Sequence, residues 1–439
     1  MRITASEVAL ATGGTLFGAD IPANGISFDS RTIEVDQAFI AIRGDRDGHD
    51  FLQSAVNRGA SFAIVEVGKS ISEMTCVEVS DTVKALASLG RHCRSRLSPT
   101  VQDRVVGITG SVGKTSTKDL VRAVLASRFV HTHAPNKSLN NDIGVPITII
   151  NAPEDCDALV IEMGMRGFGE INRLCEIAMP HIGVITAIGD AHAERVGGVS
   201  GVIAAKAELL NALPDDGLAI VNLDSELVMA TAKDTTARLV TFGQSTQADV
   251  RWDIVATTQQ AVSMVRFTHQ NVSVDGEVPL VGAHMVSNAA AAIAVGVSVG
   301  IPLAICVQAL NNVVSADHRM RWVVGRSGVR ILDDSYNANS LSMLAAVAAV
   351  ATIDATRKVA VLGKMAEVDD TVAAHTAVAK ACQEAGIAIL ALETDLYGST
   401  PLSLDEVVHL LTELDASAVV LVKGSRVAAT ERVVHALTD

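Results

Sequence analysis

The sequence predicts an α/β protein of three domains. The chain has 439 residues, which is about three times the length of a typical domain. Aromatic residues make up only 3% of a chain that is 49% hydrophobic, so its cores must consist of small and branched aliphatic residues packed between helices and sheets. Strand-like and helix-like segments alternate along much of the chain. We place the predicted domains at residues 1–100, 101–313 and 314–439.

The first predicted domain is a small α/β unit. Short apolar segments predict strands within 26–33, 38–42 and 63–65, and helical periodicity predicts a helix over 82–97. The turn-forming segment 98–100 (Ser-Pro-Thr) ends this domain, because serine and proline there favour a turn.

The second and third domains show patterns typical of parallel sheets. The second begins with a strand, a glycine-bearing loop and an amphipathic helix over 105–126, and its apolar segments 157–163 and 182–189 are typical of buried parallel strands. The third alternates apolar strands with helices, which predicts a Rossmann-like, doubly wound sheet. Its helices are predicted at about 340–352, 371–385, 404–413 and 427–437.

Charge and composition exclude several classes of partner. The net charge of −14 disfavours a surface for nucleic acid or an anionic membrane. Segment 285–316 has no charged residue, but Gly300 and Pro302 divide it into two helices of ordinary length, so we expect no membrane insertion. Six cysteines without a CxxC pair, and an N-terminus unlike a signal peptide, predict a reduced, cytoplasmic protein.

The strongest motif is a phosphate-binding loop between a predicted strand and a predicted helix. Its glycines let backbone N–H groups turn toward phosphate oxygens, while Lys114 neutralises the terminal phosphates and the Thr115 hydroxyl can bind Mg²⁺. The general pattern has glycine where Ile108 stands, so a glycine-rich turn with an exposed lysine is the alternative. The residues predicted to bind the nucleotide here are Thr109, Gly110, Ser111, Val112, Gly113, Lys114, Thr115 and Ser116.

Two further residues follow predicted strands of the same sheet. Glu162 ends an apolar strand, where a parallel sheet presents functional side chains, and a carboxylate is a suitable Mg²⁺ ligand. An ion pair with a buried partner is its alternative role. His192 lies in the loop after the strand within 182–189, and an exposed loop histidine without function is the alternative there.

Together the motifs resemble the Mur ligase family over essentially the whole chain. Any one motif is weak, but nine in the family's order argue against chance. Segments 164–171 and 333–340 resemble the branch that adds a dipeptide rather than the ligases that add single amino acids. The motifs are DSRTI (29–33), GITGSVGKTSTKD (107–119), NKSLNNDIGVP (136–146), VIEMGMRGFGEI (160–171), AIGDAHAERVGG (187–198), KAELL (206–210), SNAAAA (287–292), DDSYNAN (333–339) and VKGSR (422–426).

The resemblance implies an ATP- and Mg²⁺-dependent amide ligase. Its first domain would bind a uridine nucleotide, its central P-loop domain would bind ATP, and its Rossmann-like third domain would close over the site. The implied reaction joins D-alanyl-D-alanine to UDP-N-acetylmuramoyl-tripeptide through an acyl phosphate, as a step of peptidoglycan synthesis. The third residue of the tripeptide stays open between diaminopimelate and lysine, and a monomer is expected.

The resemblance also assigns roles to individual residues. Thr115 and Glu162 would bind one magnesium ion, and His192 and Lys206, the latter as a carbamate, would bind a second. By its position in a helix alone, Lys206 would be an exposed surface lysine. Asn288 would contact the adenine of ATP, Arg319 would contact the γ-phosphate, and Asp334 would contact the ribose.

Seven more residues are assigned to the substrates or the domain junction. For many of them a plain turn role is the alternative, because asparagine is favoured in loops whatever its function. Those on the uridine side are Ser30 and Arg31, those near the muramoyl peptide are Asn140 and Asn141, and those at the junction with the third domain are Tyr336, Asn337 and Asn339.

The sequence departs from the family's usual residues at five positions. Met285 stands where asparagine is usual, Asp142 where glutamate is usual, and Ser340 where proline is usual. His318 replaces a glycine just before Arg319, and Lys364 lies where an acidic residue is common. These differences concern local contacts and leave the predicted class unchanged.

Three other functions are compatible with part of this pattern. A related ligase could use a different amine, and a non-catalytic nucleotide-binding regulator could have lost the chemistry. A P-loop kinase or GTPase would leave the DSRTI and DDSYNAN motifs without a role. The joint presence of Lys114, Thr115, Glu162, His192 and Lys206 argues against the regulator.

Overall fold

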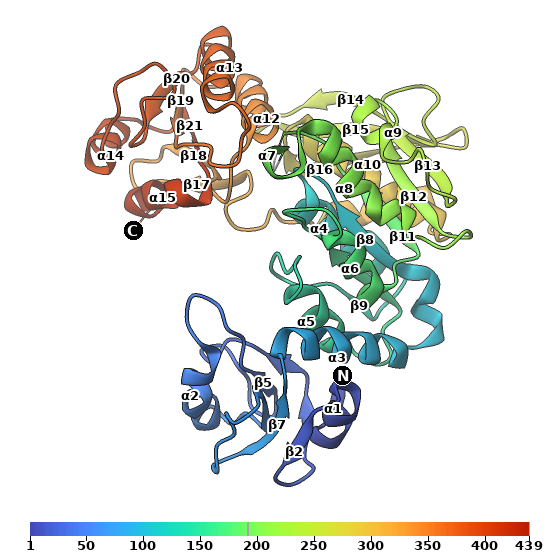
Figure 1. Cartoon of the computed structure of the whole chain (residues 1–439). Helices are drawn as coiled ribbons and strands as arrows, with labels where there is room; N and C mark the ends of the chain where they lie inside the picture. Colours follow the sequence, from blue (N-terminus) through green and yellow to red (C-terminus); the bar gives the residue numbers. More distant parts are fainter. Residues whose placement is uncertain (191–192, 439) are drawn as a thin grey trace.

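The computed structural model describes residues 1–190 and 193–438, and it contains four β-sheets distributed over three successive units. Figure 1 shows the N-terminal unit (blue) below the central unit (teal through green to yellow), with the C-terminal unit (orange to red) at the upper left. The predicted α/β class and three-part arrangement are therefore confirmed.

The N-terminal unit has a five-stranded sheet in the order β2-β7-β6-β5-β4 and a separate β1-β3 pair. The strand predicted within 26–33 is only two residues long, because the Asp29 carboxylate accepts the Arg31 N–H at 2.9 Å and turns the chain. The elements are β1 (Arg2–Thr4), α1 (Ala5–Thr12), β2 (Thr15–Phe17), β3 (Pro22–Asn24), β4 (Ile26–Ser27), β5 (Ala38–Ile40), a 3₁₀ turn (Gly48–Phe51), α2 (Leu52–Asn57), β6 (Phe62–Glu66), β7 (Thr75–Val79) and α3 (Thr82–Arg96).

The central unit is built on a nine-stranded sheet in the order β16-β15-β14-β13-β12-β11-β8-β10-β9. Its strands are β8 (Val105–Thr109), β9 (Thr132–His133), β10 (Ala158–Glu162), β11 (Ile182–Ile185), β12 (Leu218–Asn222), β13 (Arg238–Gly243), β14 (Val250–Thr257), β15 (Val262–His269) and β16 (Val272–Val281). Its helices are a 3₁₀ segment (Pro99–Arg104), α4 (Lys114–Ala126), α5 (Gly144–Ile150), α6 (Glu170–Ala178), α7 (Ala193–Val196), α8 (Val199–Asn211), α9 (Glu226–Ala230), α10 (Ala283–Ser298) and α11 (Leu303–Leu310).

Strands β8 to β14 of this sheet pair in parallel, and β15 and β16 extend it as antiparallel strands. The predicted parallel strands within 157–163 and 182–189 are confirmed as β10 and β11. The antiparallel extension was not predicted, although buried and exposed residues alternate along β15 with the period of two that marks such a strand. As expected, the uncharged segment forms two separate helices, and no described helix is both long and apolar enough to span a membrane.

The C-terminal unit is a five-stranded sheet in the order β17-β18-β21-β19-β20, parallel except for β17 at its edge. This confirms the predicted Rossmann-like βα repeat, although its last helix begins at Glu431 rather than 427, after a short 3₁₀ turn. The elements are β17 (Arg321–Val324), β18 (Arg330–Asp334), α12 (Ser340–Ala351), β19 (Arg357–Leu362), α13 (Thr371–Glu384), β20 (Ala388–Ala391), α14 (Leu404–Thr412), β21 (Ala418–Lys423), a 3₁₀ turn (Arg426–Ala428) and α15 (Glu431–Thr438).

The N-terminal unit is joined to the central unit through a shared apolar core. Buried residues of both, such as Leu86 of α3 and Ile149 of α5, belong to one cluster. Helices α3 and α5 lie side by side (Figure 1). Gly90 lets α3 approach closely, since a Cβ there would lie 2.9 Å from the Pro146 side chain. The Met1 ammonium also donates to the carbonyl of Ile150 at 3.0 Å. This packing fixes the first unit against helices α5 and α6 of the central unit.

Asn151 connects the backbones of the two units. Its Oδ1 accepts the Ile26 N–H at 2.8 Å, and its Nδ2 donates to the Ile26 carbonyl at 3.0 Å. Because Ile26 is 1% exposed, Asn151→Ala leaves two backbone groups without these partners, and we expect the free energy of unfolding to fall by about 1–3 kcal/mol. Urea denaturation measures the loss. Asn57→Ala, at an exposed asparagine, is the control, and equal midpoints for the two variants would contradict the expectation.

Candidate active site

The phosphate-binding loop joins β8 to α4 as the sequence predicts. Gly110 has φ +155°, and a Cβ there would lie 2.0 Å from the Thr186 hydroxyl, so only glycine fits. Lys114 begins α4, and its Nζ donates to the Gly110 carbonyl at 2.8 Å. The loop therefore presents the helix N-terminus and a lysine, the two features that bind phosphate.

Glu162 lies next to this loop because β10 pairs in parallel with β8, with Glu162 opposite Ile108. Its side chain is 1% exposed, and both carboxylate oxygens are hydrogen-bonded. The Thr115 hydroxyl donates to Oε2 at 2.8 Å, and Ser138 and Asn140 donate to Oε1 at 2.7 and 2.8 Å. The set of a carboxylate and a hydroxyl fits a hard cation such as Mg²⁺. Ser138 was not singled out, although it lies in one of the quoted motifs.

Lys206 is buried in α8, so its expected position on the surface is wrong. Lys206 is only 2% exposed, because the face of α8 that carries it is turned toward the central sheet. Burial lowers the pKa of Lys206 well below its ordinary value, and the charge of Lys114 adds to this effect. The neutral amine that carbamylation requires is thus favoured. His192 lies outside the described residues.

The start of α10 forms one side of the site. Asn288 is 8% exposed, and a Cβ at Gly113 would lie 2.9 Å from its Oδ1, which places this amide against the phosphate-binding loop. Its Nδ2 contacts the Met285 sulfur at 3.7 Å. His284 precedes them, and burial lowers its pKa to about 4. His284 was not predicted as a site residue.

The opposite side comes from the ends of two strands of the C-terminal sheet. Asp334 ends β18 and Lys423 ends the neighbouring β21, in register with each other. The Lys423 ammonium donates to Asp334 Oδ2 at 2.5 Å and to the Asn337 carbonyl at 2.9 Å. Lys423 was quoted within a motif but given no role. A charged residue at the end of a buried strand was the available signal, the same one that identified Glu162.

Arg319 and Tyr336 complete this side. The Arg319 guanidinium carbon lies 4.0 Å from the centre of the Tyr336 ring, and that of Arg426 lies 5.6 Å from it. Asn339 instead caps α12, accepting the Ser342 N–H at 2.9 Å. This helix cap gives Asn339 a structural role at the turn before α12.

These residues enclose a cavity of about 500 Å³ between the central and C-terminal units. Its wall includes most of the predicted nucleotide residues together with Glu162, Asn140 and the junction residues. The predicted residues that line it are Ser111, Val112, Gly113, Lys114, Thr115, Ser116, Asn140, Glu162, Asn288, Arg319, Asp334, Tyr336, Asn337 and Asn339, and unpredicted ones include Ser138, Thr186, His284, Glu367, Lys423 and Arg426.

Six of the predicted residues that the structure describes do not line this cavity, and the buried Lys206 is one of them. Thr109 and Gly110 precede the part of the loop that lines the cavity. Asn141 has a turn role, because its side chain accepts the Gly144 N–H at 2.9 Å at the start of α5. Ser30 and Arg31 belong to the N-terminal unit. The Arg31 guanidinium, through its hydrogen bonds, lowers the pKa of Asp29 to about 2.

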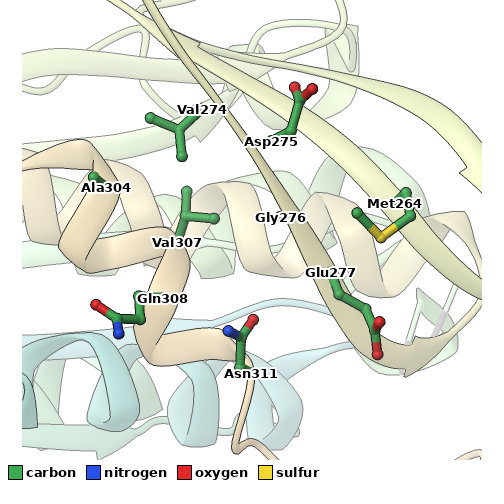
Figure 2. Close-up of a pocket in the computed structure, with 9 residues that line it drawn as sticks. All are labelled: Met264, Val274, Asp275, Gly276, Glu277, Ala304, Val307, Gln308 and Asn311. Atoms are coloured by element: carbon green, nitrogen blue, oxygen red, sulfur yellow. The ribbon is translucent and has the colours of Figure 1, made fainter.

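A second hollow of about 390 Å³ lies between β15, β16 and α11 (Figure 2), and it shares no lining residue with the first cavity. Beneath it the strand and helix are in close contact, since a Cβ at Gly276 would lie 2.2 Å from Val307. Its polar side chains, Asp275, Glu277, Gln308 and Asn311, include two acidic groups and no cation. This hollow therefore lacks the groups that bind phosphate.

The fold is that of a P-loop enzyme, and its phosphate-binding loop faces a cavity between two α/β units. Residues 108–296 match the family model "Mur ligase middle domain", and residues 318–426 match "Mur ligase, glutamate ligase domain". The chain belongs to the Mur ligase family.

Several similar proteins carry the name of one ligase. The chain is 34% identical to UDP-N-acetylmuramoyl-tripeptide–D-alanyl-D-alanine ligase of Escherichia coli, over 100% of this chain and 99% of that protein. It is 33% identical to the ligase of that name from Bacillus subtilis, over 84% and 80% of the two chains. The crystal structure of MurF from Acinetobacter baumannii superposes with a TM-score of 0.86 at 29% identity, covering 100% of this chain and 99% of that one.

The pKa of His284 predicts a dependence of stability on pH. Burial lowers this pKa to about 4 from an ordinary value of 6.5, so between these two pH values the folded protein binds fewer protons than the unfolded chain. The free energy of unfolding should therefore fall as pH drops from 6.5 to 4, and less steeply in His284→Gln. Urea denaturation across this range measures both slopes. His409→Gln, at an exposed histidine, is the control, and identical slopes for wild type and His284→Gln would refute the prediction.

Proposed function

We propose that this protein joins D-alanyl-D-alanine to UDP-N-acetylmuramoyl-tripeptide, using ATP and giving UDP-N-acetylmuramoyl-pentapeptide, ADP and phosphate. The observation that carries the proposal is the cavity in which Lys114 and Glu162 of the central unit face Arg319 of the C-terminal unit. Relatives that bear the name of this ligase match the chain along its full length.

The chemistry follows from the groups around the cavity. A carboxylate is a poor acyl donor, so an oxygen of the tripeptide's terminal carboxylate attacks the γ-phosphorus of ATP, and ADP leaves. The amine of D-alanyl-D-alanine then attacks the acyl carbon, loses a proton and displaces phosphate. Lys114 and Arg319 supply positive charge to the phosphates, and Arg319 suits this role because its planar guanidinium stays charged and binds two oxygens. Catalysis thus rests on positioning and charge, without a protein nucleophile.

Magnesium fits the residues that surround the phosphate-binding loop. Thr115 and Glu162 would hold one ion, because they offer a hydroxyl and a buried carboxylate already in contact at 2.8 Å. His192 and Lys206, as a carbamate, would hold a second, and the burial of Lys206, which lowers its pKa well below the ordinary value, supports this role. When bound, Mg²⁺ neutralises charge on the triphosphate. Asn288 would meet the adenine and Asp334 the ribose.

The three predicted domains would divide the substrates among them. Residues 1–100, with Ser30 and Arg31, would bind the uridine nucleotide, residues 101–313 would bind ATP, and residues 314–439 would close the site. Asn140 and Asn141 would lie near the muramoyl peptide. Tyr336, Asn337 and Asn339 would shape the junction with the third domain.

We place the enzyme in the cytoplasm as a monomer acting in peptidoglycan synthesis, without nucleic acid or a membrane as partner. Its free cysteines suit a reducing compartment, since each of them is buried: Cys76, Cys93, Cys156, Cys175, Cys306 and Cys382.

The experiment that tests the proposal is ATP-dependent phosphate release with UDP-N-acetylmuramoyl-tripeptide. D-alanyl-D-alanine is compared with free D-alanine and with no amine, and the product is identified by mass. We expect release only with the dipeptide and a product heavier by that dipeptide. Release with a different amine alone would refute the acceptor and keep the ligase class, whereas no release with any pair would favour a regulator.

Lys114→Ala should abolish ligation. The substitution removes the ammonium that faces the terminal phosphates while the loop glycines keep the backbone in place. Turnover should fall at least about 100-fold, since one charged group is lost from the transition state, and circular dichroism should show an intact fold. Lys84→Ala, at an exposed lysine, is the control. Retained turnover in Lys114→Ala would exclude the assigned role.

Glu162→Gln should raise the Mg²⁺ concentration needed for half-maximal turnover by about tenfold or more, because the amide keeps the size of the side chain and loses its charge. Titration of activity against Mg²⁺ at saturating ATP measures the shift. Glu226→Gln, at an exposed glutamate, should leave the titration unchanged. An unchanged Mg²⁺ requirement in Glu162→Gln would contradict its role as a ligand.

A further inference from the structure

The chain passes from the central to the C-terminal unit through a strained corner at residues 318–320. His318 has φ +61° and Met320 has φ +51°, both in the left-handed region that residues other than glycine rarely adopt. Arg319, which lines the cavity, lies between them. The direction of Arg319 therefore depends on what holds its two neighbours.

Four hydrogen bonds hold this corner against the end of β18. The Met320 N–H donates to Asp334 Oδ1 at 3.1 Å, and the Tyr336 N–H donates to the His318 carbonyl at 3.1 Å. These two use the backbone of the corner. The other two depend on the imidazole itself, because His318 Nδ1 lies 2.8 Å from Asp333 Oδ2 and 3.2 Å from the Ser335 hydroxyl.

The partner of the imidazole is a buried carboxylate. Asp333 is 3% exposed, and its Oδ1 accepts the N–H of Ser335 at 3.1 Å and the hydroxyl of Ser335 at 2.6 Å. Within the described chain, His318 is the recorded donor to Oδ2. A carboxylate only accepts, so Nδ1 carries the hydrogen. The imidazole thus completes the hydrogen bonds of Asp333 and ties the corner to a rigid strand end.

We propose that His318 is a positioning residue for Arg319. By anchoring the left-handed corner to Asp333, it holds the Arg319 guanidinium over Tyr336 and toward the terminal phosphate of the bound nucleotide. A glycine, which the family resemblance led us to expect here, would adopt the corner without strain but would offer no anchor. The inference rests on the proposed function, because it takes the ligand of Arg319 to be a nucleoside triphosphate.

Three substitutions separate the anchor from the backbone conformation. His318→Gly keeps the corner accessible and removes the anchor, while His318→Ala removes the anchor and keeps the strain. His318→Asn should restore function, because its Nδ2 lies the same number of bonds from Cα as histidine Nδ1, and asparagine tolerates the left-handed region.

The measurement is calorimetric binding of ADP and of a non-hydrolysable ATP analogue to the full-length protein. We expect His318→Gly and His318→Ala to bind the analogue about five- to tenfold more weakly while ADP affinity changes less than about twofold, and His318→Asn to approach wild type; a ratio of ten corresponds to the loss of one phosphate contact. Asp333→Asn should show the same selective loss. A merely structural defect would weaken both ligands.

Two controls make the outcome decisive. His435→Ala removes a ring 6.2 Å from His318, and it should leave both affinities unchanged. Arg319→Ala should itself abolish the preference for the analogue. If it does not, the phosphate role of Arg319 in the proposed function is wrong, whatever His318 does. If Arg319→Ala loses the preference and His318→Gly keeps it, the backbone alone positions Arg319, and the inference about His318 is overturned.

Discussion

The parallel register of β8, β10 and β11 is the constraint on which the site depends. Parallel strands end at the same edge of a sheet, so the phosphate-binding loop after β8, Glu162 at the end of β10 and Thr186 after β11 lie together. The Thr186 hydroxyl then fills the space that a Cβ at Gly110 would need. Loop conformation, metal ligand and cavity wall thus follow from one pattern of strand pairing.

Both outer units share apolar cores with the central unit. One buried cluster joins the N-terminal unit to it, and another contains residues of α10 in the central unit and of α12 in the C-terminal unit. Relative movement of either unit would therefore expose buried apolar surface. The C-terminal unit has a polar contact as well, because the Ser340 hydroxyl donates to Asp190 Oδ2 at 2.5 Å.

Local patterns predicted what depends on a single segment. The strand–loop–helix motif, the parallel strands and the βα repeat were visible because each is encoded by adjacent residues. Roles that depend on distant partners were not: Lys423 meets Asp334 across two strands, and His284 meets the cavity through the direction of α10. Lys206 shows the limit most clearly, since its helix is amphipathic only weakly and the buried face could not be identified from periodicity.

Although the chain is acidic, two lysines line the cavity, and each of them forms hydrogen bonds with neighbouring groups. Lys114 donates to the Gly110 carbonyl, and Lys423 donates to Asp334 and to a carbonyl. Burial lowers the pKa of Lys114, and the Glu162 carboxylate opposes that shift, so this carboxylate helps to keep the ammonium charged. A phosphate can replace a neutral carbonyl as the partner of Lys114 without leaving any carboxylate unpaired. When a triphosphate binds, Lys114 can therefore give up its hydrogen bond to a neutral carbonyl and form a stronger, charge-assisted bond to a phosphate oxygen.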